Sequence, residues 1–120
     1  MSAETNKEKT ILWFEAFNEK NIEKLLSLYD DKAEHFSPKL KVRMPETNGL
    51  IKGKQQLFDW WNDAFVRLPS LKYTVNYIIA DQNKVFMEYV RSVENEADMI
   101  VGEVLSFENG KIIASKVFHQ

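Results

Sequence analysis

The apolar residues in the first half of the chain recur at helical spacing, and this pattern predicts three helices. The first is expected to begin at Thr5, which forms a capping-box sequence with Glu8, and to continue through the apolar segment 11–17. The second is predicted over residues 22–29 and is expected to end at Asp30-Asp31. The first helix is apolar around much of its girth, so we expect it to be well buried.

The third helix is predicted over residues 57–68, where apolar residues fall at i, i+3, i+4, i+7, i+8 and i+11. Pro69 is expected to stop it, because proline cannot continue a helix. Between the second and third helices, residues 33–38 are expected to form a short strand that ends at Pro38. The polar stretch around Pro45 is expected to be a connecting loop.

After Pro69 the period of the apolar pattern changes to two, which predicts strands. The four candidate strands are the segments LKYTVNYII, VFMEYV, DMIVGEVLSF and KIIASKVF, and their connections are of hairpin length. Three helices followed by an antiparallel meander predict an α+β fold. Because no repeat or linker interrupts the pattern, we expect residues 1–120 to form a single domain.

Both faces of the predicted sheet carry apolar residues. The odd-numbered set contains Val75, Tyr77, Met99, Val101, Leu105 and Val117, and the even-numbered set contains Phe86, Val90, Ile100, Val104, Ile112 and Phe118. Three helices can cover only one face of a sheet. We therefore expect a homodimer that forms through the even-numbered face, with Val90, Ile100, Val104 and Phe118 at the contact.

Glu103 interrupts the odd-numbered apolar stripe, between Val101 and Leu105. Ionised carboxylates are rarely buried without a partner, because removing the charge from water is costly. Two interpretations follow: Glu103 is paired with another group, or it faces a cavity that uses an acid.

The first hairpin register bears on this choice. A two- or four-residue loop at Asn95-Glu96 puts Glu88 opposite Glu103, and repulsion between the two carboxylates would raise the pKa of one of them. A three-residue loop instead puts Met87 or Tyr89 opposite Glu103. The sequence leaves these alternatives open.

The final turn offers a second choice. A two-residue turn at Asn109-Gly110 puts Lys116 opposite Glu103 and predicts a cross-strand ion pair in solvent. A three-residue turn puts Ser115 there and His119 on the same face. The second register predicts an acidic pocket with apolar walls.

Composition and charge restrict the kind of partner. Hydrophobic residues make up 44% of the chain and charged residues 28%, which is typical of a globular protein rather than a disordered one. The net charge of −2 argues against a nucleic-acid partner, and the absence of cysteine excludes disulfides and thiolate chemistry. The polar start MSAETNKEKT and the lack of a long apolar run predict a cytoplasmic protein without membrane contact.

The order of three segments, LLSLYDDKAEHFSP, IKGKQQLFDWW and EVLSFENGKI, resembles the nuclear transport factor 2-like superfamily. This group includes SnoaL-like polyketide cyclases, ketosteroid isomerases and limonene-epoxide hydrolases. The resemblance covers nearly the whole chain. It implies a cone-shaped, curved and mostly antiparallel sheet packed on three N-terminal helices, a cystatin-like fold with a ligand pocket between sheet and helices.

The ketosteroid isomerases carry three polar groups in that pocket, and the resemblance assigns a position to each. The general base falls at Ser37, the oxyanion-hole tyrosine at Trp13 and the protonated aspartate at Glu103. The pocket tryptophan of the last strand falls at His119. Since base and tyrosine are replaced, the resemblance argues against steroid isomerisation by that mechanism, but it places Glu103 inside the pocket.

Other chemistry-bearing residues allow a functional and a structural interpretation. His35 either lines the pocket or lies on the surface, and the set of His35, His119 and Glu103 has no spacing typical of a metal site, so no metal is expected. Trp61 is expected to pack inward, with Trp60 over the cavity. A basic segment contains Lys39, Lys41, Arg43, Lys52 and Lys54, and it is either a solvated loop or a lid that attracts an anion.

These patterns predict a small-molecule-binding protein that acts on an apolar, carbonyl-bearing substrate by acid/base steps without a cofactor. Glu103 and His119 are the expected catalytic pair. The expected substrate-binding residues are Trp13, Phe17, Tyr29, His35, Ser37, Trp60, Trp61, Glu88, Val101, Leu105 and Val117. The alternatives are a non-catalytic module for a hydrophobic ligand and a dimeric interaction protein, since one fold hosts many activities.

Overall fold

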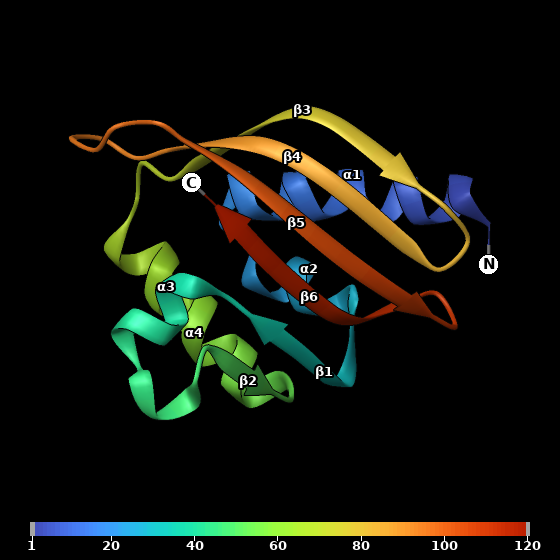
Figure 1. The fold of residues 1–120 in the computed structure, drawn as a ribbon, viewed down its shortest axis with the longest axis horizontal. Coiled ribbons are helices and arrows are strands. Elements are labelled where there is room, and N and C mark those ends of the chain that lie inside the picture. Colours follow the sequence, from blue (N-terminus) through green and yellow to red (C-terminus); the bar gives the residue numbers. More distant parts are fainter. Residues whose placement is uncertain (1, 120) are drawn as a thin grey trace.

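The computed structural model describes residues 2–119 and consists of one six-stranded sheet with helices packed against it (Figure 1). The helices are α1 (Ala3–Glu19), α2 (Ile22–Ser27), α3 (Pro38–Arg43) and α4 (Lys54–Arg67), with a single 3₁₀ turn at Pro45–Thr47. The strands are β1 (Tyr29–Phe36), β2 (Leu50–Lys52), β3 (Lys72–Ala80), β4 (Lys84–Ser92), β5 (Met99–Glu108) and β6 (Lys111–His119).

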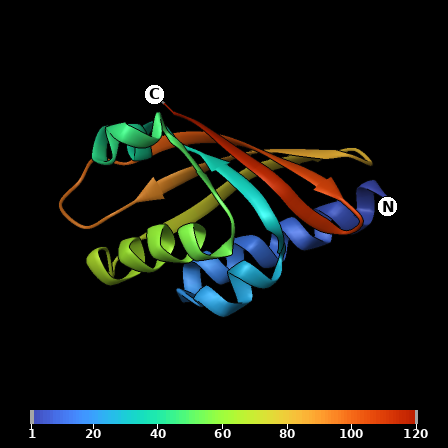
Figure 2. The same ribbon diagram turned by 90° about the horizontal axis from the view of Figure 1, so that it is seen from below.

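The strand order in the sheet is β2-β1-β6-β5-β4-β3. Neighbouring strands are antiparallel except for β1 and β6, which run parallel. The helices α1, α2 and α4 lie on one face of the curved sheet, and none of these three covers the opposite face (Figure 2). The predicted α+β fold with a mostly antiparallel curved sheet is therefore confirmed.

The first two helices form where the apolar pattern places them, but their ends differ from the prediction. Ser2, not Thr5, caps α1, since its hydroxyl accepts the backbone N–H of Thr5. The second helix ends at Ser27 rather than at Asp30-Asp31, because Tyr29 is already extended and pairs with Ile112 of β6. Tyr29 fits the helical spacing of the residues before it, although it is the first, buried residue of β1.

Besides the 3₁₀ turn at Pro45–Thr47, the segment expected to be a loop contains a helix and a strand that the pattern did not predict. Pro38 ends β1 by starting α3: Ser37 caps this helix with its hydroxyl on the Lys39 N–H, and proline occupies the first helical position. The second element, β2, pairs with β1 and is only three residues long. Both are too short to produce a recognisable period.

The hairpin registers are decided by β-bulges as well as by turns. Met87 lies opposite Glu103, which is one of the registers expected for a three-residue loop, although the connection from Ser92 to Met99 is longer; the Glu88 register is wrong. On the other side Val117 lies opposite Glu103, which neither turn alternative predicted. The last turn does have two residues, but an irregularity at Ser106/Phe107 shifts the pairing by one.

The irregularity at Ser106/Phe107, and a second one between Val75 and Tyr77, place two residues on the opposite face of the sheet from the one that was predicted. Ile112 was placed with the even-numbered outer set, yet it is fully buried on the helix side because it pairs with Phe107. Tyr77 was placed with the inner set, but the shift between Val75 and Tyr77 pairs it with Glu88, and it lies on the outer face. Val75 and Tyr77 are both exposed.

The uncovered sheet face remains apolar at several positions, including Ile100 and Phe118, which are 41% and 50% exposed. We propose that this face forms a homodimer, because an exposed apolar patch of this kind favours association. Phe118→Lys should then produce a monomer, while Val66→Lys, on the exposed side of α4, should not. Sedimentation velocity at roughly tens of micromolar measures the difference, and a monomeric wild-type protein would refute the dimer.

Among residues 2–119, no helix combines the length and the hydropathy that a transmembrane span requires.

Candidate functional site

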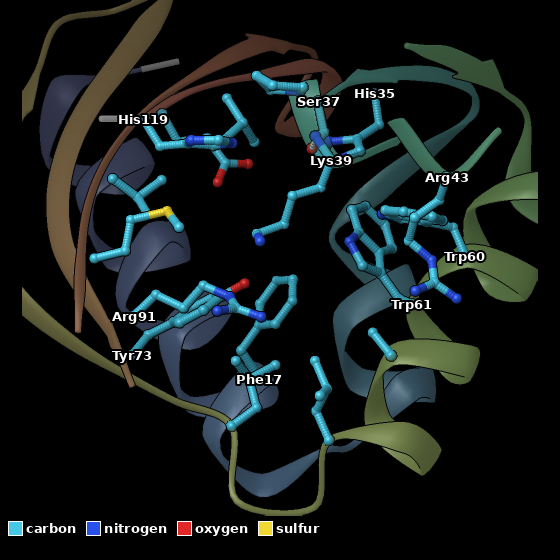
Figure 3. Close-up of a pocket in the computed structure, with 18 of the residues that line it drawn as sticks. Phe17, His35, Ser37, Lys39, Arg43, Trp60, Trp61, Tyr73, Arg91 and His119 are labelled. Atoms are coloured by element: carbon cyan, nitrogen blue, oxygen red, sulfur yellow. Dashed lines mark hydrogen bonds between the residues drawn. The ribbon is translucent and has the colours of Figure 1, made fainter. Parts of the chain in front are cut away.

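A cavity of about 430 Å³ opens between the inner face of the sheet and the helices α3 and α4 (Figure 3). This volume is within the range of small-molecule sites. The residues on its wall that the sequence had singled out are Phe17, His35, Ser37, Trp60, Trp61, Val101, Glu103, Val117 and His119. The strand pairing explains this grouping, because the odd residues of β4 and β5 share the inner face with those of β6 that lie opposite them.

Glu103 lies in this wall and is 1% exposed. The Tyr89 hydroxyl donates a hydrogen bond to its Oε1 atom at 2.7 Å. The other oxygen, Oε2, is buried and has no hydrogen-bond partner within residues 2–119. Burial raises the pKa of the Glu103 carboxyl to about 8, against the opposing effect of the Tyr89 hydrogen bond. Glu103 is therefore a neutral carboxylic acid at pH 7.

Two tyrosines surround this acid and were not predicted as site residues. Tyr73 of β3 and Tyr89 of β4 both line the cavity, and their ring centroids are 4.4 Å apart. Burial, with a smaller contribution from a charge on Glu103, raises the pKa of both hydroxyls. Both tyrosines therefore stay protonated and can act as hydrogen-bond donors beside Glu103.

His35 is the end of a buried hydrogen-bonded chain. Its Nδ1 atom lies 2.6 Å from the Ser115 hydroxyl, which accepts from the Tyr29 hydroxyl at 3.2 Å. Tyr29 in turn accepts the indole N–H of Trp13 at 3.1 Å. Burial lowers the pKa of His35 to about 3, so its imidazole is neutral at pH 7. The chain holds the His35 ring at the cavity wall.

Three of the predicted ligand contacts lie behind the wall rather than on it. Trp13, Tyr29 and Leu105 are fully buried but do not line the cavity. Trp13 and Tyr29 support the His35 chain, and Leu105 belongs to the apolar core. Their apolar stripe predicted burial correctly, but periodicity does not distinguish a core residue from one that lines a cavity.

Glu88 does not belong to the site. It lies on the opposite face of the sheet, where one of its carboxylate oxygens accepts the Asn76 side-chain amide at 2.9 Å. The register that places Met87 opposite Glu103 directs Glu88 outward. The raised pKa of Glu103 therefore comes from burial and not from a second carboxylate.

His119 lies at the end of β6, opposite Val101, and lines the cavity on the same face as Glu103. Ser37 also lines the cavity, although its hydroxyl caps α3. Within the described part of the chain, no three histidine or acidic side chains gather in a way that could hold a metal ion.

Several charged residues line the cavity but are missing from the set of substrate-binding residues predicted from the sequence. Lys39 and Arg43 of α3, Arg67 of α4 and Arg91 of β4 line it, together with Glu96. Arg91 could have been found from the sequence, because Met87, Tyr89 and Arg91 continue the inward stripe of β4. Lys39 and Arg43 were noted only as part of a basic segment, because α3 was not predicted.

Comparisons with known proteins agree with this architecture. A SnoaL-like protein of unknown function from Burkholderia thailandensis superposes with a TM-score of 0.89 at 20% identity, covering 100% of this chain and 99% of the other. A proposed ketosteroid isomerase from Kribbella flavida gives 0.80 at 15% identity, with 98% and 79% covered. A proposed polyketide cyclase from Sinorhizobium meliloti gives 0.78 at 12% identity, with 92% and 94% covered.

No curated protein matches this sequence. The SnoaL-like domain, by contrast, matches residues 12–115, which is most of the chain and includes β1 to β5 entirely. With this match and the shared fold, the chain belongs to the SnoaL-like domain family.

Proposed function

We propose that this protein binds a largely apolar small molecule that carries a carbonyl oxygen, and that it promotes proton transfer on this molecule without a cofactor. The observation that carries the proposal is the state of Glu103. A neutral carboxylic acid with one buried, unpartnered oxygen lies in the wall of a cavity of ligand size. Such an oxygen is costly to bury unless a ligand pairs with it.

The two oxygens of Glu103 have different tasks in this proposal. Oε1 accepts from Tyr89, so the acid proton is on Oε2 and is available to a ligand carbonyl. A donor aimed at a carbonyl oxygen stabilises the negative charge that develops there when a neighbouring C–H proton is removed. Tyr89 is a positioning residue, because its hydrogen bond fixes the orientation of the carboxyl group.

His119 is the proposed proton acceptor. It comes from the strand next to Glu103 and lines the same cavity face. His35 is less suited to this task, because burial keeps its pKa at about 3 and makes it a weak base. The aromatic side chains of Phe17, Trp60 and Trp61 supply an apolar surface for the body of the ligand.

A non-catalytic binding module is the alternative, and a specific observation favours it. Ser37 stands where the ketosteroid isomerases have their general base, and its hydroxyl is engaged as the cap of α3. Trp13 stands where they have a tyrosine, and it is buried behind the cavity. If His119 does not act as a base, the same cavity holds its ligand without chemistry.

A hydrogen–deuterium exchange experiment distinguishes the two proposed functions. It uses 2-tetralone, a bicyclic ketone with acidic C–H protons beside its carbonyl. Dissolved with the protein in D₂O, it should exchange these protons faster than the buffer-catalysed background, as followed by NMR. Glu103→Gln should lower the protein-dependent rate by about 10²-fold or more, because an amide is a far weaker acid. Glu88→Gln, an acid of the opposite sheet face, should leave the rate unchanged.

The outcomes distinguish the hypotheses. Binding of 2-tetralone without accelerated exchange supports the binding module. Exchange that survives Glu103→Gln would refute the role of this acid. His119→Ala should abolish exchange while preserving binding, and a variant that keeps both would remove His119 from the mechanism.

A further inference from the structure

Positive charge gathers at the end of the cavity that α3 and α4 border. Lys39 comes from α3, Arg67 from α4 and Arg91 from β4, and Arg43 adds a fourth cation. Figure 3 shows the Lys39 side chain extending into the middle of the cavity, with Arg91 pointing toward the same space from the sheet. Three separate elements thus direct cations to one region.

Acidic partners compensate this charge incompletely. Glu96 accepts from Arg91 Nη1 at 2.9 Å, while Asp63 accepts from Arg67 Nε at 2.7 Å and lies 3.8 Å from Arg43 Nη2. No hydrogen bond or ion pair joins the Lys39 ammonium to another side chain within residues 2–119. The remaining acid of the wall, Glu103, is neutral at pH 7 and does not compensate this charge.

The positions of Lys39 and Arg91 are energetically unfavourable for positively charged side chains. Arg91 is 8% exposed. Its hydrogen bond to Glu96 involves only the Nη1 atom, and the guanidinium group has several more N–H donors. Burial, followed by the charges of Arg91, Arg43 and Arg67, lowers the pKa of Lys39 despite the opposing effect of Glu96. An anion between the two side chains would remove this repulsion and occupy the free donors.

Arg91 is separated from Glu103 along the sheet. Arg91 pairs with Met99, four residues along β5 from Glu103. At a strand rise of about 3.3 Å per residue this is roughly 13 Å. Aromatic side chains, Phe17 and Tyr73 among them, also line the cavity. The cavity therefore has Arg91 and the neutral acid Glu103 at separate positions along the sheet, apolar side chains in its wall and the Lys39 side chain in its middle.

Resting on the proposed function, we infer that the ligand is an organic acid whose carboxylate is held between Lys39 and Arg91, with its apolar body directed toward Glu103. This adds a charge requirement to the apolar ligand predicted from the sequence. It also assigns a task to the basic segment, whose Lys39 reaches the cavity while Lys41 is exposed and does not line it.

A matched pair of probes tests this inference: biphenyl-4-carboxylate and biphenyl-4-carboxamide, which share a shape and differ in charge. Titration calorimetry at pH 7 should show the carboxylate binding roughly ten- to a hundredfold more tightly, as for one charge-assisted contact. Lys39→Met should remove this preference by weakening the carboxylate and leaving the amide unchanged. Lys39→Arg should preserve it, and so should the matched control Lys41→Met.

Equal affinity for the two probes, or failure of both to bind, would overturn the inference. A carboxylate preference that survives both Lys39→Met and Arg91→Met would also overturn it, because the anion would then bind elsewhere. Thermal melting of each variant verifies that it is folded. The proposed function fails separately, when 2-tetralone exchange is absent or insensitive to Glu103→Gln, whichever probe binds better.

Discussion

Glu103→Gln is expected to make the protein more stable than the wild type at pH 8 while leaving the two nearly equal near pH 4. The folded state raises the pKa of Glu103 from 4.5 to about 8, so the folded protein binds a proton that the unfolded chain has lost between these values. Wild-type stability should therefore fall as the pH rises through this window. The slope approaches about 1.4 kcal/mol per pH unit, and glutamine removes it.

His35 opposes this trend over part of the range. Its pKa is lowered from 6.5 to about 3, so its neutral form favours folding above pH 6.5 and this contribution is lost as the pH falls. Between pH 4.5 and 6.5 the effects of His35 and Glu103 have opposite signs. The wild-type slope by itself should be read from pH 6.5 to 8, where the Glu103 contribution continues and that of His35 has ended. Both proteins contain His35, so its contribution cancels in the difference between wild type and variant.

Urea unfolding at several pH values measures the stability difference, and NMR titration of the Glu103 carboxyl carbon measures the pKa directly. Glu88→Gln is the control, because that side chain lies on the outer face of the sheet and not in the cavity. A Glu103 pKa at or below about 4.3, the value in model peptides, would contradict both the buried neutral acid and the site built on it.

Removal of residues 111–120 is expected to abolish cooperative folding. β6 lies between β1 and β5, so its loss leaves each of these strands without a backbone partner on one side and divides the sheet into β2-β1 and β5-β4-β3. It also removes the fully buried Ile112 and the Ser115 hydroxyl, which joins His35 to Tyr29. Circular dichroism and calorimetry should show no cooperative transition.

Ile112→Ala is a milder change in β6 than deletion of the whole strand. The strand and its hydrogen bonds remain, and the lost methyl groups should lower the free energy of unfolding by about 2–5 kcal/mol. A truncated protein that still melts cooperatively near the wild-type temperature would contradict the central position of β6. An Ile112→Ala variant as stable as wild type would contradict the inward direction that the bulge assigns to Ile112.

Local pattern determined much of this fold. The helical spacing in residues 57–68 and the alternation in β4 and β5 depend on neighbours in the chain, so they predicted these elements and the apolar stripe that contains Glu103. The sequence also indicated a buried acid, because Glu103 interrupts an apolar stripe. What such a stripe could not indicate is whether the acid meets a partner or a cavity.

The short elements escaped prediction for a physical reason. α3 and β2 have six and three residues, and neither is long enough to show a period. They are stabilised by their surroundings, with β2 paired to β1 and Leu40 of α3 fully buried. Because the sequence pattern predicts a loop here, it offered an anion-attracting lid as one alternative for the basic segment, but it did not single out Lys39 as the residue that enters the cavity.

The sequence by itself determined the fold class and the apolar stripe in which Glu103 stands, because both depend on a local period; the inward position of Glu103 was implied only by the family resemblance. The tertiary structure decided which residues lie next to Glu103. One bulge between Ser106 and Phe107 set Val117 opposite Glu103, and the hairpin register brought Tyr89 to this acid and turned Glu88 away. Strand pairing joins residues distant in the chain, and a shift of one position exchanges the two faces, so the composition of the site is a property of the folded sheet.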